Sequence, residues 1–589
     1  MLEIPSAGGG VLSLATNTLS YLILACGIAT IVVTAYLVLV SYSKLPAWDG
    51  WIQIDFAASE GPSHTLDWLW HPDNGHRMVI PNLFLLADLR WFHATQAFLL
   101  ASIFVIQLLH LWLLGWSMRV LGEWRGALWR TGFGLTAFCL FCPSQRGNFV
   151  WGIATCFVLP GLFATLSFIG LLLYWMRSRE YYGRWASWKY LVLSIAAALG
   201  ATYSLSNGNL LWPLLVAAAL LLRLRIAAVL TLAVSGIVST TVYLYNYIRL
   251  SSAPLEMPVT VCKYLAAYFG SSFVPTTDDV LHLSQSTIRP AELVGIAGLL
   301  VFSLLLMRLP SYIRSRRFFS IQLVLTLLFC VGTGVLTAWG RSSFGVGHAF
   351  SSRYQTVALV FWCCMALLLL CEITFWRSRG QNVALLSSQV LLLGIMLVAA
   401  YWARTPLTMA RFGGFHLNAA GVALITDVPD VDEFYWTDYP NHVLSLVPYM
   451  RSARLSVFSG SEPDLLGEPL SSEFNLTSTK DCTGKVESTT VIANDSQRSL
   501  RIKGWAWDNK DGRPPAELVI ATDGIITGLG VVGDFRPINR ETNPAVTSNF
   551  SGFIGYVRDV QKSSTVEVYA VTRKGKKSAC YLATLVPSP

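Results

Sequence analysis

The sequence predicts a polytopic α-helical membrane protein with about eleven transmembrane helices, followed by a C-terminal all-β sandwich domain. Its 589 residues are 53% hydrophobic and only 13% charged, which is not the composition of an ordinary soluble protein. Apolar stretches long enough to cross a bilayer recur over roughly the first 400 residues and then stop. We therefore expect a membrane domain over residues 1–402, an external connector over 403–470 and an external β-sandwich over 471–589.

The expected spans are separated by short polar connections. They cover residues 17–41, 93–118, 127–142, 150–176, 190–205, 208–222, 226–247, 292–308, 320–339, 354–375 and 382–402. Arg and Lys clusters fall in connections on one side, such as 177–189, 308–317 and 377–379. Because cytoplasmic loops are enriched in positive charge, we expect a cytoplasmic N-terminus and an external C-terminal domain. The first apolar run has no basic segment before it and no small-residue cleavage site after it, which predicts an uncleaved span.

The net charge of +9 does not indicate a nucleic-acid partner. Most of the Arg residues lie in short loops between apolar runs, where they act as topology signals. The partners expected from composition are therefore membrane lipids, with no nucleic acid.

The last part of the chain has the pattern of an antiparallel β-sandwich or a small barrel. Alternating segments such as SLRIKGWAW and STVEVYAV are separated by turn signals. Trp505 and Trp507 share one face of a strand, where they either stack on sugars or fill the core; we favour the core. Cys482 and Cys580 bracket this domain, which predicts a disulfide in an oxidising compartment, the alternative being two free thiols.

The first external loop, residues 44–92, is polar and rich in tryptophan. We expect helices lying in the membrane interface, with Trp48 and Trp51 among the belt residues. Asp49 follows the first span within AWDGWIQID, and Asp55 comes six residues later. Carboxylates are costly at a membrane surface unless something requires them, so Asp49 is a catalytic base, a solvated loop residue or the N-cap of an interfacial helix, and we favour the base. Asp55 is expected to be a supporting polar group.

A second polar cluster in this loop contains His71, Asp73, His76 and Arg77. Three interpretations remain open: a metal site, bonding within the loop, or catalysis in which cations hold a phosphate. The H-x-D-x-x-H spacing is no specific metal signature, so no cofactor is certain and a divalent metal is only weakly indicated.

Another polar segment, GRSSFGVGHAFSSRYQT, lies at the outer end of the tenth expected span. It brings Arg341, His348, Arg353 and Tyr354 to the side with the fewest positive charges. Arginines at a membrane boundary often snorkel, but two of them with a histidine on this side fit a phosphate site better.

An ordered set of motifs carries a family resemblance. WDGW, HPDNGHR, PSQRGNFVWG, SNGNLLWP and GR…SSRYQT follow one another over most of residues 40–375. This set resembles bacterial multi-span glycosyltransferases of the GT-C fold, including the O-antigen-modifying enzymes. The tail motif GWAWD…DG…FRP…SGF also resembles a β-domain appended to some such proteins.

The resemblance implies an enzyme of the bacterial cytoplasmic membrane that takes a sugar from a polyprenyl phosphate carrier on the external face. It assigns the catalytic base to Asp49 in an inverting transfer of hexosyl type. The acceptor would be a cell-surface polysaccharide or a lipid-linked glycan. The residues expected to contact the substrates are Arg353, Arg341, Arg77, His76, Asp73, His348, Tyr354, Asp55, Trp48 and Trp51. Two departures stand out, since Gly75 and Arg146 occupy positions where related loops often carry an acid.

Two other classes of function compete with this one. A transporter or lipid-linked sugar flippase would carry ionisable residues within its spans and paired broken helices. The expected spans are nearly free of charge and show no clear internal repeat. A scaffold whose β-domain binds surface glycan without chemistry would bind polysaccharide but never consume a polyprenyl-phosphate sugar.

Overall fold

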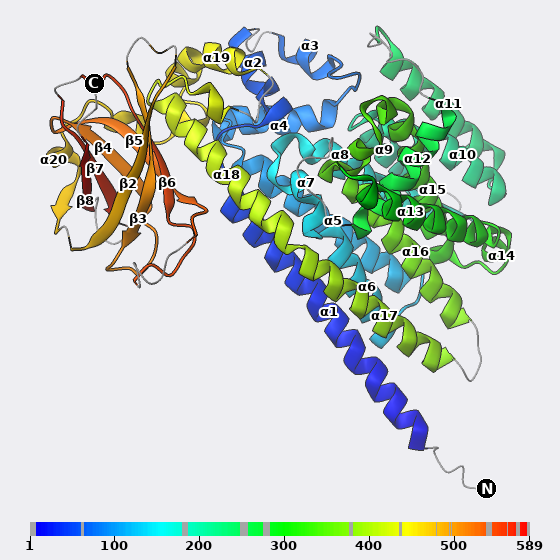
Figure 1. Cartoon of the computed structure of the whole chain (residues 1–589). Coiled ribbons are helices and arrows are strands. Elements are labelled where there is room, and N and C mark those ends of the chain that lie inside the picture. The colour runs from blue at the N-terminus through cyan, green and yellow to red at the C-terminus, as the bar shows by residue number, and fades with distance from the viewer. Residues whose placement is uncertain are drawn as a thin grey trace. The chain divides into compact units, whose positions relative to one another are not determined.

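The chain folds into helices followed by one β-sheet, as seen in a computed structural model (Figure 1). The structure describes residues 7–59, 64–178, 187–247, 257–274, 283–375, 381–434, 439–478, 480–493, 495, 498–537, 545–561, 564–572 and 578–585. Four of the arginines that predict the orientation in the membrane lie outside these residues: Arg179, Arg184, Arg377 and Arg379. Two compact units form: Met1–Leu39 with Thr65–Phe84 and Leu99–Met409, and Val40–His64 with Leu85–Phe98 and Ala410–Pro589.

Each expected span coincides with a helix. The helices are α1 (Ala7–Ser41), α5 (Ala97–Val120), α6 (Gly126–Leu140), α8 (Thr155–Arg177), α9 (Trp188–Thr202), α10 (Leu211–Leu221), α11 (Ile226–Leu244), α13 (Gln285–Leu306), α15 (Phe318–Arg341), α16 (Gln355–Phe375) and α17 (Gln381–Trp402). Within the described residues, 8 helices are long and apolar enough to cross a membrane. The protein is thus consistent with a multi-pass helical membrane protein, and the larger number of spans stays a prediction.

Further helices lie in segments expected as loops or connector. They are α2 (Ile52–Ser59), α3 (Thr65–Trp70), α4 (Val79–Phe92), α7 (Arg146–Val150), α12 (Pro258–Gly270), α14 (Leu309–Arg314), α18 (Arg404–Ile425), α19 (Pro440–Ser452) and α20 (Leu470–Glu473). The connector is therefore mostly ordered, because α18 continues for 22 residues where only partial helix was expected.

Small residues allow the helices of the first unit to approach closely. A Cβ added to Gly270 of α12 would lie 1.7 Å from the carbonyl oxygen of Ala291 on α13. Gly295 of α13 is equally close to Ala266, with 1.8 Å to its carbonyl oxygen. Backbone contact through such small residues is the usual way in which membrane helices gain packing energy.

The C-terminal domain is a single sheet of eight strands. They are β1 (Asn475–Thr477), β2 (Cys482–Val491), β3 (Leu500–Asp508), β4 (Glu517–Thr522), β5 (Ile525–Asp534), β6 (Gly552–Val557), β7 (Val566–Thr572) and β8 (Ser578–Leu585). Their order is β1-β8-β7-β4-β5-β6-β3-β2, antiparallel except for the parallel pair β1 and β8.

The predicted β-domain is therefore confirmed, and of its two expected forms the small barrel is closer to this single sheet than the two-sheet sandwich. Strand β4 pairs with both β5 and β7, so the two halves that would have faced each other belong to one sheet. Gly530 of β5 pairs with Gly555 of β6, and glycines without side chains let a sheet bend sharply. The sheet curls as a half-barrel in place of the expected sandwich (Figure 1).

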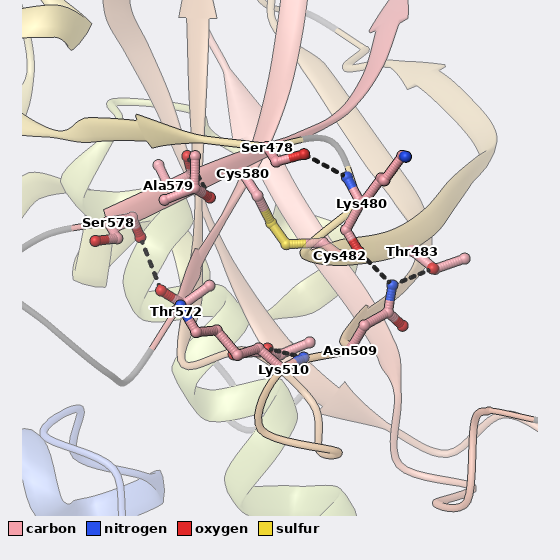
Figure 2. Close-up of a disulfide and its surroundings, with 12 residues drawn as sticks. Ser478, Lys480, Cys482, Thr483, Asn509, Lys510, Thr572, Ser578, Ala579 and Cys580 are labelled. Atoms are coloured by element: carbon pink, nitrogen blue, oxygen red, sulfur yellow. Dashed lines mark hydrogen bonds between the residues drawn. A yellow bond between two sulfur atoms is a disulfide. The ribbon is translucent and has the colours of Figure 1, made fainter.

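The predicted disulfide between Cys482 and Cys580 is confirmed, with 6.1 Å between the two Cα atoms (Figure 2). Cys482 opens β2, the last strand at one end of the sheet, and Cys580 lies in β8, next to the other end. The bond therefore joins the two ends of the curled sheet. The preferred interpretation of the tryptophans is also confirmed, because Trp505 and Trp507 are buried together with Val546.

Candidate functional site

The first unit carries its main polar cluster between α15 and α16. Arg341 ends α15, and three short 3₁₀ turns follow: Ser342–Phe344, Val346–Phe350 and Ser352–Tyr354. Gly345 separates the first two turns with a φ of 91°, a left-handed conformation that glycine adopts without strain. This chain path places the side chains of His348 and Arg353 next to each other.

Arg353, His348 and Tyr264 form a continuous hydrogen-bonded chain. Nη2 of Arg353 donates to Nε2 of His348 over 3.0 Å. Since that nitrogen accepts, the imidazole proton resides on Nδ1, which lies 3.2 Å from the hydroxyl oxygen of Tyr264 on α12. The ring of Tyr354 lies 5.3 Å from the Arg353 guanidinium carbon and packs edge-on against His348. The arginine is thus held by one neutral histidine and one aromatic ring.

The electrostatics of this cluster are strongly positive. Burial, with Arg353 and Arg341 nearby, lowers the pKa of His348 to about 4. Burial and Arg341 lower the pKa of His76 in the same way, also to about 4. Both imidazoles are therefore neutral near pH 7, while the two guanidinium groups stay charged. We call Arg341, Arg353, His348 and His76 the cationic cluster.

The cationic cluster has unused hydrogen-bonding capacity. Among the described residues, no carboxylate forms an ion pair with Arg341 or Arg353. Nε of Arg353 and Nδ1 of His76 are buried with no hydrogen-bond partner in that part of the chain. A buried donor without a partner costs about 1–3 kcal/mol, so an anionic group that accepts a hydrogen bond from Nε of Arg353 would bind favourably here.

The PSQRGN segment, residues 143–148, forms a hydrogen bond to the backbone of Arg353. Nδ2 of Asn148 donates to the Arg353 carbonyl over 3.0 Å and to Oγ1 of Thr356 over 2.7 Å. Thr356 in turn donates to Oε1 of Gln145 over 2.5 Å. A Cβ on Gly147 would lie 2.3 Å from Oγ of Ser352, so a larger residue here would displace that hydroxyl. Sequence reasoning missed Gln145 and Asn148, although both stand in a polar turn between two apolar runs.

Arg146 lies in the same segment and is 9% exposed. Burial lowers its pKa to about 10, so it remains charged at neutral pH. The segment thus carries a buried guanidinium group in the position where an acid was expected from the family resemblance.

His76 reaches the cationic cluster from a tight turn in the first external loop. Asp73 and His76 exchange two backbone hydrogen bonds of 2.9 and 2.7 Å. Asn74 and Gly75 between them have φ values of 49° and 74°, as in the type I′ turn that Asn-Gly favours. The turn explains why glycine occupies position 75. No group of three or more potential metal ligands occurs among the described residues, which includes His71, Asp73 and His76.

Arg77 has a different environment from the other expected phosphate ligands. Its side chain is 1% exposed and donates from Nε to the Tyr243 carbonyl over 2.6 Å. Nη1 donates to the Trp70 carbonyl over 2.5 Å, and Nη2 donates to the Tyr245 carbonyl. These bonds tie the loop to the end of α11, so we leave Arg77 out of the proposed phosphate site.

Asp49 belongs to the second unit, on the 3₁₀ turn Trp48–Trp51. Its side chain is exposed, whereas Trp51 is buried in the hydrophobic core of that unit. Trp48 has a φ of 51° and an exposed ring. The turn therefore holds an accessible carboxylate beside one anchored and one exposed indole.

Asp55 lies further along, on α2. Its Oδ1 is 2.6 Å from Nε2 of His442 on α19, and both side chains are partly exposed. This hydrogen-bonded contact fits the supporting role that we expect for Asp55.

A buried acid in the second unit escaped sequence reasoning. Asp88 of α4 is 0% exposed, and its Oδ2 accepts from Nε2 of Gln53 and from the backbone of Gln96, both over 3.3 Å. Burial raises the pKa of Asp88 to about 6. Gln53 belongs to α2, directly after the turn of Asp49, so Asp88 helps to anchor that turn.

The candidate residues thus fall into two groups. Arg341, His348, Arg353, Tyr354, His76, Asp73 and Arg77 belong to the first unit, where the first five come together. Asp49, Asp55, Trp48 and Trp51 belong to the second unit. No family model, curated protein or solved structure matches this chain.

Proposed function

We propose that this protein is a membrane glycosyltransferase that moves a sugar from a polyprenyl-phosphate carrier to a cell-surface glycan. The observation that carries the proposal is the cationic cluster. In it, Arg353 and Arg341 lie near two histidines whose lowered pKa values keep them neutral. A phosphate diester or monoester is the anion that arginines of this kind recognise best.

The donor phosphate occupies the cationic cluster. Arg353 and Arg341 neutralise the charge that develops on the phosphate as the sugar leaves, and the buried Nε of Arg353 supplies one further donor. Stabilisation of the leaving group by preorganised cations replaces a general acid, because a phosphate leaves without being protonated.

Asp49 is the general base. Its carboxylate removes the proton from an acceptor hydroxyl, and the hydroxyl oxygen forms a bond to C1 of the sugar. The bond between C1 and the phosphate oxygen breaks at the same time, and its electron pair leaves with the polyprenyl phosphate. The anomeric configuration inverts, because the acceptor attacks from the face opposite to the leaving group. An exposed carboxylate on a turn anchored by Trp51 supports this role.

The topology belongs to the same proposal. About eleven helices span the bacterial cytoplasmic membrane, the N-terminus is cytoplasmic, and the β-domain is outside. The positive connections between the helices and the disulfide of the β-domain support this orientation.

The test is transfer by the purified full-length protein in lipid nanodiscs. Radiolabelled polyprenyl-phosphate sugar is supplied with surface glycan from a strain that lacks the protein. Native protein should label the glycan, and Asp49→Asn should lose at least about 1,000-fold in rate while still binding the donor, since the base acts on the acceptor. Asp67→Asn, an acid on α3, serves as the matched control. Full activity of Asp49→Asn would remove the base assignment, and donor translocation without transfer would favour a flippase.

A further inference from the structure

The second unit contains a cavity between α18 and the sheet. Its volume is about 440 Å³, and its lining includes Asn418 and Val422 of α18, Glu517 of β4 and Leu529 of β5. This volume lies within the range of about 300–1,000 Å³ that small-molecule sites occupy. No residue of the cationic cluster and no residue of the Asp49 turn lines this cavity.

One wall of the cavity carries both hydrogen-bond donors and acceptors. Nζ of Lys44 lies 3.4 Å from Oε1 of Glu462, and Oε2 of Glu462 is buried without a partner among the described residues. Burial and Glu462 raise the pKa of Glu517, while Lys44 lowers it. The lysine and the two carboxyl groups therefore act on one another at this wall.

The rest of the cavity lining includes apolar side chains. Val422 and Ile425 of α18, with Val457 and Leu529, expose hydrocarbon to the same space. Gly421 keeps this side open, because a Cβ there would lie 2.9 Å from Val457. The cavity thus combines a hydrogen-bonding wall and a hydrocarbon wall.

The balance of charge restricts the class of ligand. Two cations, Lys44 and Arg411, and two carboxyl groups, Glu462 and Glu517, line the cavity, so it has no excess positive charge for a phosphate. The ammonium group beside the carboxylates occupies the place that a divalent cation would need, and no group of three metal ligands occurs in the described part of the chain. A neutral molecule rich in hydroxyl groups satisfies both conditions, because each hydroxyl donates to a carboxylate and accepts from an ammonium group.

We propose that this cavity binds a short uncharged segment of the acceptor glycan, an inference that rests on the proposed glycosyltransferase function. Sugar hydroxyls bond to Glu517, Lys44 and the free oxygen of Glu462, and the C–H face of a ring lies on Val422 and Leu529. The β-domain then serves to recognise the glycan that receives the sugar.

Binding is measured without donor, so it does not depend on turnover. The probe is the host's own surface polysaccharide, released from its lipid and added to full-length protein in nanodiscs. Saturation-transfer NMR and calorimetry should detect binding to native protein. Glu517→Gln should weaken it about 10-fold, the loss expected for one hydrogen bond to a charged group. Ala516→Trp places an indole at the cavity mouth, where Ala516 is exposed, and should abolish binding.

The matched control is Glu468→Gln, an exposed glutamate outside the cavity, which should leave affinity within about twofold. Equal binding by native protein and Ala516→Trp would overturn the inference, as would binding of glycerophosphoethanolamine but no polysaccharide. If native protein transfers sugar but does not bind the polysaccharide in the cavity, the inference alone fails. If it binds there but never transfers, the proposed transferase function fails and the cavity assignment stands.

Discussion

The guanidinium group of Arg353 donates a hydrogen bond to the neutral imidazole of His348, with 3.0 Å between Nη2 and Nε2. A protonated histidine could not accept this bond, so the low pKa of His348 and the contact depend on each other. The contact fixes the arginine without cancelling its charge, in contrast to an ion pair with a carboxylate.

Removing the acceptor from His348 should therefore misplace Arg353. We expect His348→Phe to keep the ring packing against Tyr354 and to lower kcat/KM for the donor by about 10- to 100-fold, the value of a hydrogen bond to a charged group. Transfer kinetics at varied donor concentration measure the effect. His71→Phe, an exposed histidine outside the cationic cluster, should behave as native protein. An unchanged kcat/KM in His348→Phe would show that the contact does not position Arg353.

Asn148 should matter for activity although it does not touch the donor. Asn148→Ala removes the bonds to the Arg353 carbonyl and to Thr356, and we expect a loss of about 1–3 kcal/mol in stability. Donor affinity should fall with it, as measured by calorimetry with polyprenyl phosphate. Asn148→Asp can donate neither to the Arg353 carbonyl nor to Thr356, whose hydroxyl proton already goes to Gln145, so it should remain impaired. Recovery of affinity in Asn148→Asp would show that the bond to the backbone is dispensable.

Asp88 should make stability depend on pH. Below about pH 4 its carboxyl is protonated in both the folded and the unfolded protein. As the pH rises through 6, the folded protein must ionise a buried carboxyl, and up to about 3 kcal/mol of stability is lost. We expect the difference in thermal midpoint between Asp88→Asn and native protein to grow between pH 4 and pH 7. A difference that stays constant over this range would mean that Asp88 does not titrate there.

Arg501 should be essential for the fold of the second unit. Its Nη1 lies 2.8 Å from Oδ2 of Asp430, a carboxylate that is 2% exposed and also accepts from Tyr556. Arg501→Met leaves that carboxylate buried without its cation and should cost about 3–5 kcal/mol in unfolding experiments. The exposed pair of Arg454 and Asp464 provides the comparison, since Arg454→Met should cost less than about 1 kcal/mol. Similar losses in the two variants would contradict the assignment.

The disulfide should stabilise the β-domain substantially. It closes a loop with a sequence separation of 98, for which chain entropy gives about 4–5 kcal/mol. Replacing Cys482 and Cys580 together by Ser should speed proteolysis within the sheet of the full-length protein, as followed by mass spectrometry. Cys262→Ser, which alters an exposed free thiol, should not. Equal cleavage rates in the two proteins would show that the loop is stable without the bond.

The sequence predicted the parts of this fold that depend on local patterns. Every expected span coincides with a helix. A bilayer-length apolar run favours a helix, because the backbone must satisfy its own hydrogen bonds inside the membrane. The length of helix α18 was underestimated, because its arginines and glycines interrupt the apolar pattern. The sequence did not separate a sandwich from a small barrel, because strand alternation is the same in one curled sheet and in two stacked sheets.

In the candidate site, too, local sequence features were predicted and contacts between distant residues were not. Arg341 and Arg353 were found because charges are rare on their side of the expected topology. The support of Arg353 by Asn148 was not, because 205 residues separate them and no local pattern encodes that contact. Asn74 and Gly75 did carry a signal, as Asn-Gly marks a two-residue turn, but family expectation drew attention to the missing acid instead.

The bond between Cys482 and Cys580 turns most of the β-domain into a covalent ring. A single cut anywhere inside that ring leaves both pieces attached to the rest of the protein. The strand β1 lies just before the ring and pairs with β8 inside it, so the pieces also stay in register at that edge. Where proteases act on exposed loops, the β-domain can therefore be cut once and stay in one piece.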